Sequence, residues 1–318
     1  MKRQAFSERY KPDWTKFEQM LLVLEGGSAR VDLRTFPELY RRICRHLALA
    51  RHRGYGADYV DYLNDLAIRG HRQLYGRRPS IRSNITRFIS VDFPRVVRAN
   101  GRFVLLAAVL LFAPDWIMQG AVRLRPALVY SVMSPEQVVD FEAMYDPEAR
   151  RMGGERGSMS DIYMFGFYIR NNITVGFRTF AGGMLFGLGT AFFLIYNGLL
   201  FGGVAGHLHN IGYAEPFRGF VAGHGPFELT AIVLAGAAGF KIGMALLAPG
   251  RRSRARALLE EAKSSAPLIY GFAGLLVLAA FVEAFWSSTN WIPFELKIAV
   301  GWTLWTAVFV YFGFGGRE

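Results

Sequence analysis

Residues 227–247 read FELTAIVLAGAAGFKIGMALL, and the basic segment RRSRAR follows at residues 251–256. A helix needs about 20 predominantly apolar residues to cross the hydrocarbon core of a bilayer, and the first segment has that length and character. Short loops rich in arginine stay on the cytoplasmic side of a membrane. Together the two segments predict a transmembrane helix whose C-terminal end faces the cytoplasm.

Four further apolar tracts flank this helix, at residues 103–119, 172–208, 267–286 and 296–313. The tract at 172–208 is too long for one ordinary span, and the sequence FGLGT at residues 186–190 suits a tight turn near its middle. We therefore expect this tract to form a hairpin of two spans. The predicted fold is all-α, a polytopic transmembrane bundle of about six spans.

The N-terminal hundred residues have a different composition, with short amphipathic helices whose polar faces are rich in arginine. The chain has 37 basic and 25 acidic residues, a formal charge of +12, and most of the excess lies here and in the basic segment. Such an excess suits either nucleic acid or an anionic membrane face. The long apolar tracts favour the membrane, so we expect no nucleic-acid partner. The predicted domains are a cytoplasmic helical domain at residues 1–100 and the membrane bundle at residues 101–318.

Alternation of the spans, counted from the cytoplasmic basic segment, places both termini in the cytoplasm. The same count places residues 121–170 on the outside, as an extracytoplasmic segment. Within it, residues 135–144 have the apolar spacing of an amphipathic helix. The lipid bilayer is thus the first expected partner of the chain.

Polar side chains interrupt the apolar tracts at few places, and ionisable groups inside a membrane are costly. The topology gives several of them a common depth, near the outer side. Pro226 suits a first helical turn, where the helix dipole stabilises the carboxylate of Glu228. Glu283, near the C-terminal end of a span, lacks this support and needs a partner, either His224 or an asparagine. The predicted polar cluster comprises Asn171, Asn172, Asn197, His224, Glu228 and Glu283.

Besides a transport pathway and a polar pocket for a partner or lipid, two interpretations of this cluster remain open. The simpler is a buried hydrogen-bond network that fixes the register of the helices. In the other, His224, Glu228 and Glu283 are ligands of a divalent metal such as zinc, and His207 and His209 could add nitrogen ligands. The spacing does not match the HExxH motif of zinc proteases, so no cofactor is expected from a motif.

The same residues resemble the stage II sporulation protein M family. The resemblance rests on Asn171-Asn172, on Asn197-Gly198 and above all on HGPFE at residues 224–228 followed by a span of small residues. Glu283, Trp14 and the pair Leu63-Asn64 fit it as well. The resemblance implies a protein of the bacterial cytoplasmic membrane. It also implies possible protein partners, because genes of the branch with a long N-terminal domain often lie beside genes for MoxR-type ATPases and for proteins with von Willebrand factor A domains.

In spore formers, the founding member of this family resembles a membrane scaffold that holds peptidoglycan hydrolases. No nucleotide-binding or nucleophile motif is visible in the sequence, so we expect a non-enzymatic scaffold of the cell envelope that recruits protein partners through its cytoplasmic domain. Association with further copies of the chain is compatible with this role. The alternatives are an intramembrane metal-dependent hydrolase that uses the His/Glu/Glu cluster, and a transporter of a small solute or lipid. Polar groups gathered at one depth count against transport.

Overall fold

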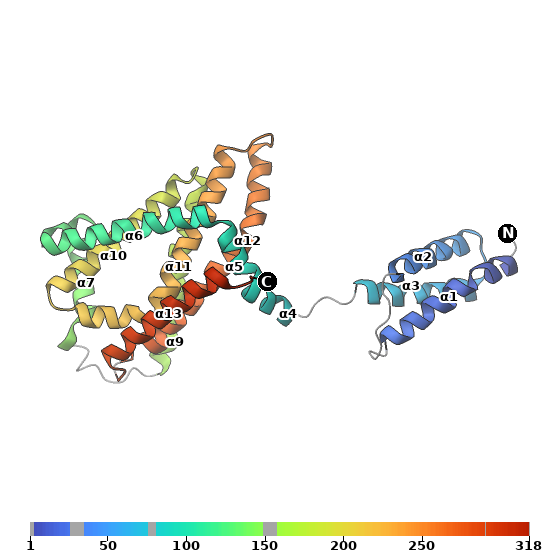
Figure 1. Ribbon diagram of the computed structural model, residues 1–318, viewed down its shortest axis with the longest axis horizontal. Helices are drawn as coiled ribbons and strands as arrows, with labels where there is room; N and C mark the ends of the chain where they lie inside the picture. The colour runs from blue at the N-terminus through green and yellow to red at the C-terminus, as the bar shows by residue number, and fades with distance from the viewer. Residues whose placement is uncertain (1–2, 26–34, 76–80, 149–157, 290, 318) are drawn as a thin grey trace. The chain divides into compact units, whose positions relative to one another are not determined.

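A computed structural model describes residues 3–25, 35–75, 81–148, 158–289 and 291–317. The regular structure of these residues is helical throughout, which confirms the all-α prediction. The chain divides into two compact units, Met1–Asn84 and Ile85–Glu318, and Figure 1 shows the helices of each. The division falls before residues 85–100, so this stretch belongs to the second unit instead of the N-terminal one.

The first unit is a bundle of three helices, α1 (Arg3–Glu25), α2 (Phe36–His52) and α3 (Ala57–Tyr75). Apolar residues at helical spacing on each helix form one core, whose fully buried members include Phe17, Leu21, Ile43, Leu63 and Leu66. Polar contacts join α1 to α3 at the edge of this core. The hydroxyl of Tyr62 donates to Glu18 Oε2 at 2.9 Å, and Arg69 donates two hydrogen bonds to the carboxylate of Glu25 at 3.0 and 2.8 Å.

His46 is a buried polar residue within this unit. The indole Nε1 of Trp14 donates to its Nδ1 at 3.1 Å, which requires that nitrogen to be unprotonated. Burial lowers the pKa of His46 below its ordinary value, and the nearby Arg45 and Arg42 act in the same direction, whereas Asp13 opposes them. The folded unit therefore favours the neutral imidazole.

We expect the first unit to lose stability as the pH falls below about 6.5, the ordinary pKa of histidine. Because the pKa of His46 is lower in the folded state than in the unfolded state, the unfolded chain binds the proton first, and the stability present at neutral pH is lost on acidification. Hydrogen exchange in α1–α3, corrected for its intrinsic pH dependence, measures this loss. The variant His46→Gln should flatten the profile in this range, and an unchanged profile would refute the assignment to His46.

The second unit contains the apolar helices. In order these are α4 (Ile81–Arg87), a π-helical turn (Phe88–Asp92), α5 (Phe93–Ala99), α6 (Gly101–Leu124), α7 (Pro135–Tyr145), α9 (Ser158–Ala181), α10 (Leu188–Asn210), α11 (Ala214–Leu247), α12 (Arg254–Val282), a second π-helical turn (Glu283–Ser287) and α13 (Phe294–Phe314). A short 3-10 turn, Pro126–Ser131, joins α6 to the segment that contains α7. The predicted amphipathic helix at residues 135–144 corresponds to α7.

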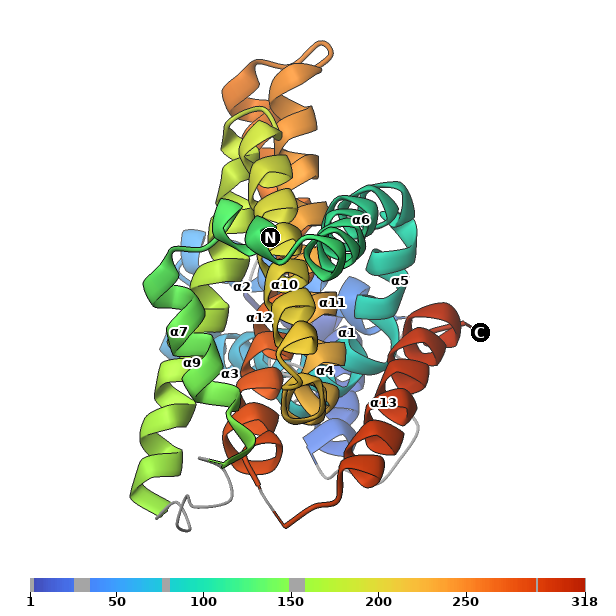
Figure 2. The ribbon, with the colours of Figure 1, turned by 90° about the vertical axis from the view of Figure 1, so that its left-hand side faces the viewer.

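Five of the described helices are long and apolar enough to cross a membrane: α6, α10, α11, α12 with its π-helical turn, and α13. Helix α11 is the central one, since it contacts α6, α9, α10, α12 and α13 and 72% of its apolar window is buried, against 17% for α6 and α13. Figure 2 shows α13 at the edge of this unit. Large apolar side chains on the peripheral helices are exposed, among them Trp116, Ile117, Trp302 and Phe309. Lipid is the environment that suits such a surface.

The apolar tract at residues 172–208 is a hairpin, as the sequence predicted. Its arms are α9 and α10, and the turn between them includes Gly187 at φ 84°, a left-handed conformation that favours glycine. The hydroxyl of Thr190 in α10 donates a hydrogen bond to the carbonyl of Thr179 in α9 at 2.7 Å and so connects the two arms. Helix α9 starts at Ser158 and contains Arg170, Asn171 and Asn172, which make it less apolar than the five membrane-competent helices. Five of the expected six spans are thus matched by apolar helices among the described residues, and α9 as the sixth stays a prediction.

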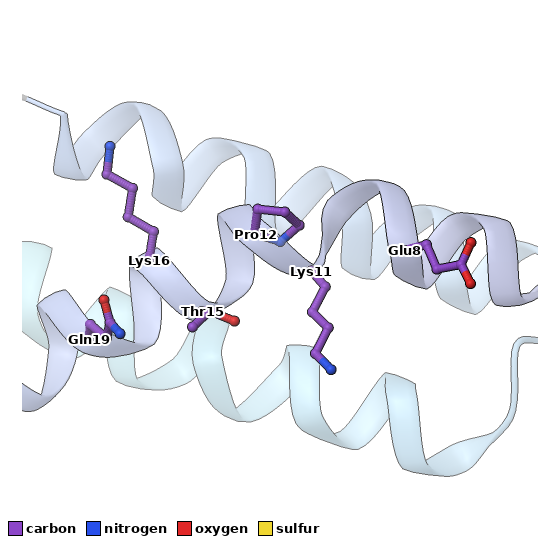
Figure 3. A pocket seen from close by; sticks show the side chains of 6 residues that line it. All are labelled: Glu8, Lys11, Pro12, Thr15, Lys16 and Gln19. Atoms are coloured by element: carbon purple, nitrogen blue, oxygen red, sulfur yellow. The ribbon is translucent and has the colours of Figure 1, made fainter.

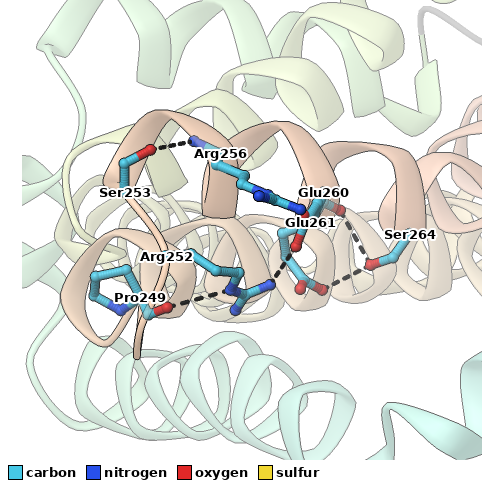
Figure 4. A network of polar contacts seen from close by, with 7 residues as sticks. All are labelled: Pro249, Arg252, Ser253, Arg256, Glu260, Glu261 and Ser264. Carbon is cyan, nitrogen blue, oxygen red and sulfur yellow. Dashed lines mark hydrogen bonds and ion pairs between the residues drawn. The ribbon is translucent and has the colours of Figure 1, made fainter.

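The basic segment forms the turn between α11 and α12, with Ser253 as the N-cap of α12 (Figure 4). Arg252 and Arg256 both donate to the carboxylate of Glu260, at 2.8 and 2.9 Å. Lys241 Nζ of α11 lies 3.1 Å from a carboxylate oxygen of Glu261 in α12. This ion pair connects α11 to α12 at this end of the bundle.

Candidate functional site

A cavity of about 500 Å³ lies inside the second unit, between α6, α7, α9, α10 and α11 and beside the end of α12. Aromatic side chains form much of its wall, including Phe141, Tyr168, Phe201 and Phe220. The remainder of the wall is polar. All six residues of the predicted cluster line it: Asn171, Asn172, Asn197, His224, Glu228 and Glu283.

Helix α11 supplies two of these residues. His224 and Glu228 are four apart, so they lie on one face of the helix, and His224 Nε2 is 3.8 Å from Glu228 Oε2. The expectation that Pro226 begins this helix is wrong, because α11 starts at Ala214 and Pro226 lies inside it. The positive end of a helix dipole therefore does not stabilise Glu228. Its position toward a cavity needs another explanation.

Glu283 opens the π-helical turn that follows α12. The expected partner of this carboxylate is an asparagine: Asn172 Nδ2 donates to Glu283 Oε2 at 3.4 Å, and Asn171 Nδ2 donates to Asn172 Oδ1 at 3.2 Å. Both asparagines lie in the middle of α9, and not at the start of a span as the sequence suggested. At the other end of the π-helical turn, Ser287 Oγ is 3.0 Å from His224 Nδ1. One turn of chain thus contacts both α9 and α11.

The three ionisable residues converge. One ligand atom from each of His224, Glu228 and Glu283 lies within 4.8 Å of the other two. His224 and Glu283 are buried, and the side chain of Glu228 is only 15% exposed. At this spacing, the three ligand atoms could contact one common cation or one common water molecule.

Glu228 differs from the other two because, within the described part of the chain, no hydrogen bond to its carboxylate is found. The side chain of Glu228 is 15% exposed and lines the cavity, so its carboxylate is accessible from there. This observation favours a ligand-binding or catalytic cluster over a purely structural one.

Asp115 and Gln119 of α6, which are not members of the predicted cluster, also line the cavity. Asp115 was visible as a charged interruption of an apolar tract, which is a sufficient signal for a functional hypothesis. Lys297 of α13 is a second omission. This buried lysine donates to the carbonyls of Ser287 and Thr289 at 2.9 and 2.6 Å, and so supports the turn that holds Glu283.

The two additional histidines do not join the cluster. His207 Nε2 lies 2.7 Å from Glu142 Oε1 of α7, and His209 is exposed near the end of α10. Asn197 lines the cavity, and its amide also donates to the carbonyl of Phe193 at 2.6 Å. The six residues predicted to share one depth thus line one cavity, whereas the two additional histidines do not line it.

The bundle with its five membrane-competent helices defines a polytopic membrane protein. Residues 102–288 match the family model of stage II sporulation protein M, which covers more than half of the 318 residues, and the chain belongs to this family. Residues 4–76, within the first unit, match a domain family of unknown function. The chain is 32% identical over 127 residues to the uncharacterized protein MJ0793 of Methanocaldococcus jannaschii, a match that covers 39% of this chain and 70% of that protein. No solved structure matches the chain.

Proposed function

We propose that this protein is an intramembrane hydrolase whose cavity contains the catalytic group. The observation that carries the proposal is the convergence of His224, Glu228 and Glu283 within 4.8 Å at the wall of a cavity. A carboxylate without a hydrogen-bond donor, next to a histidine in a site of low dielectric, is suited to take a proton from water. The expected non-enzymatic role gives no reason for such a cavity.

The reaction class is hydrolysis of an ester or amide bond. The oxygen of a water molecule attacks the acyl carbon, the bond from that carbon to the leaving oxygen or nitrogen breaks, and the proton removed from water passes to the leaving group. The primary amides of Asn172 and Asn197 each use one N–H in the contacts described and have a second N–H for an oxyanion. The aromatic wall suits an apolar substrate such as a lipid or a membrane peptide.

We expect Glu228→Gln to lower hydrolysis at least 100-fold, because removal of a general acid–base group costs about 10²–10⁴ in rate. The measurement is product release from fluorogenic acyl esters and peptides by the purified full-length chain in detergent. His207→Gln, which alters a histidine outside the cluster, is the matched control and should retain the rate. Equal turnover by Glu228→Gln and the unaltered chain would exclude this carboxylate from the reaction.

A second candidate is the scaffold role, which the separate first unit favours. This unit has its own hydrophobic core, and its surface carries a shallow depression on α1 lined by Glu8, Lys11, Pro12, Thr15, Lys16 and Gln19 (Figure 3). We propose that it recruits a soluble protein, and the resemblance suggests a MoxR-type ATPase. The test is whether that ATPase co-purifies with the full-length chain and is lost when Phe17→Ala unfolds the first unit.

A further inference from the structure

We propose that His224, Glu228 and Glu283 bind one divalent transition-metal ion, zinc or manganese, at the wall of the cavity. The proposal deepens the hydrolytic function by naming what activates the water, and the binding itself is measurable without any activity. It starts from three side chains on two elements, α11 and the π-helical turn after α12, whose ligand atoms lie within 4.8 Å of one another.

Charge is the first argument. Two carboxylates so close together inside a membrane bundle repel strongly in a medium of low dielectric. Among the described residues, neither Glu228 nor Glu283 forms an ion pair with a lysine or arginine. A proton shared between the carboxylates would leave one negative charge in the bundle. One divalent cation with two carboxylates and a neutral imidazole gives a net charge of zero, which suits a buried site.

The outer contacts are the second argument. Metal-binding histidines commonly use their other ring nitrogen in a hydrogen bond that fixes the tautomer. Here His224 Nδ1 contacts Ser287 Oγ at 3.0 Å. When Nδ1–H donates this bond, Nε2 keeps its lone pair and faces Glu228. The carboxylate of Glu283 is oriented in the same way by Asn172, which Asn171 orients in turn.

The ligand set indicates the class of ion. Imidazole suits zinc, iron, copper and nickel, whereas carboxylates suit magnesium, calcium and manganese. One nitrogen and two oxygen ligands thus favour zinc or manganese. Ligands about 2.1 Å from a tetrahedral ion lie about 3.4 Å apart, so ligand atoms that are now up to 4.8 Å apart would move closer together on binding. Three protein ligands leave at least one position open toward the cavity, as catalytic sites do.

The first measurement is the metal content of the full-length chain, purified in detergent without chelator. We expect about one zinc or manganese ion per chain. After the metal has been stripped, titration with Co²⁺ should produce the visible absorption bands of a nitrogen- and oxygen-coordinated ion. Failure of the unaltered chain to take up Zn²⁺, Mn²⁺ or Co²⁺ at micromolar concentration would overturn the proposal, and this result does not depend on any variant.

The variants Glu228→Gln and Glu283→Gln keep the shape of each side chain and remove its charge. Each should weaken Co²⁺ binding at least 100-fold, and Ser287→Ala should weaken it about 10- to 100-fold through the orientation of His224. The matched controls are Glu142→Gln and His207→Gln, which alter a histidine–glutamate pair elsewhere in the same unit and should bind normally. Equal binding by all of these monodisperse variants would show that the metal lies elsewhere.

Metal content and turnover separate this inference from the proposed function. A chain that binds one ion per site through these residues but hydrolyses no ester or amide sustains the metal site and refutes the hydrolase. A stripped chain that still hydrolyses its substrate, with loss of activity in Glu228→Gln, sustains the hydrolase and refutes the metal site. In that case the two carboxylates act through a shared proton.

Discussion

Gly202→Val is expected to force α6 and α10 apart and to destabilise the bundle by about 3 kcal/mol, the upper end of the usual range for overpacked cores. A Cβ atom at Gly202 would overlap the backbone carbonyl of Asp115 in α6, and one at Gly198 would overlap the carbonyl of Leu111. A backbone carbonyl cannot rotate aside as a flexible side chain can. The two helices would therefore have to separate along their whole contact.

The measurement is the unfolding free energy in mixed detergent micelles, with size-exclusion chromatography as a test of monodispersity. Gly274→Val in α12 is the control, because a Cβ at that glycine meets no heavy atom within 4 Å, and it should cost less than about 1 kcal/mol. Since Asp115 and Gln119 line the cavity beside this contact, any Gly202→Val protein that does fold should also bind Co²⁺ more weakly. A stable, monodisperse Gly202→Val chain with normal metal binding would show that the α6–α10 packing is not as close as described.

The glycines illustrate what the sequence could and could not provide. The four-residue spacing of Gly198 and Gly202 predicts that two helix backbones approach closely, and they do so in the structure. The spacing does not name the partner helix, because any neighbour with a small or exposed backbone surface would satisfy it. That the partner is α6, and that the contact carries Asp115 to the cavity, follows only from the three-dimensional packing.

The polar cluster shows a similar limit. The position of a residue along a predicted span gives its expected depth in the membrane. By this count, residues from three separate tracts have the same expected depth. The direction in which each side chain points depends on where its helix begins, and α9 and α11 begin earlier than the apolar tracts indicate, at Ser158 and Ala214. Pro226 normally marks a first turn, but a membrane helix can contain proline when its neighbours satisfy the freed backbone groups. The contact between Ser287 and His224 also required the π-helical turn, which has no sequence signal.

Phe17→Ala is expected to unfold the first unit and to leave the bundle intact. Phe17 is fully buried, its ring stacks on Phe36 with centroids 5.0 Å apart, and Gly70 of α3 lies directly against it. Truncation of a buried phenylalanine costs about 3–5 kcal/mol. A unit of this size has a total stability of roughly 4–12 kcal/mol, so the loss removes at least a quarter of it and, toward the lower end of this range, all of it.

Limited proteolysis should cut the Phe17→Ala chain within α1–α3 and leave the bundle as a stable fragment. The control Leu22→Ala, on the same helix, removes a side chain that is 60% exposed and should stay resistant.

Because the two units have separate cores, the Phe17→Ala chain should still bind one metal ion while it loses the ATPase partner. Loss of the metal together with the partner would mean that the first unit supports the cavity directly. Retention of the ATPase by an unfolded first unit would place the recruiting surface on the bundle, and the scaffold role would then belong to the same unit as the proposed chemistry.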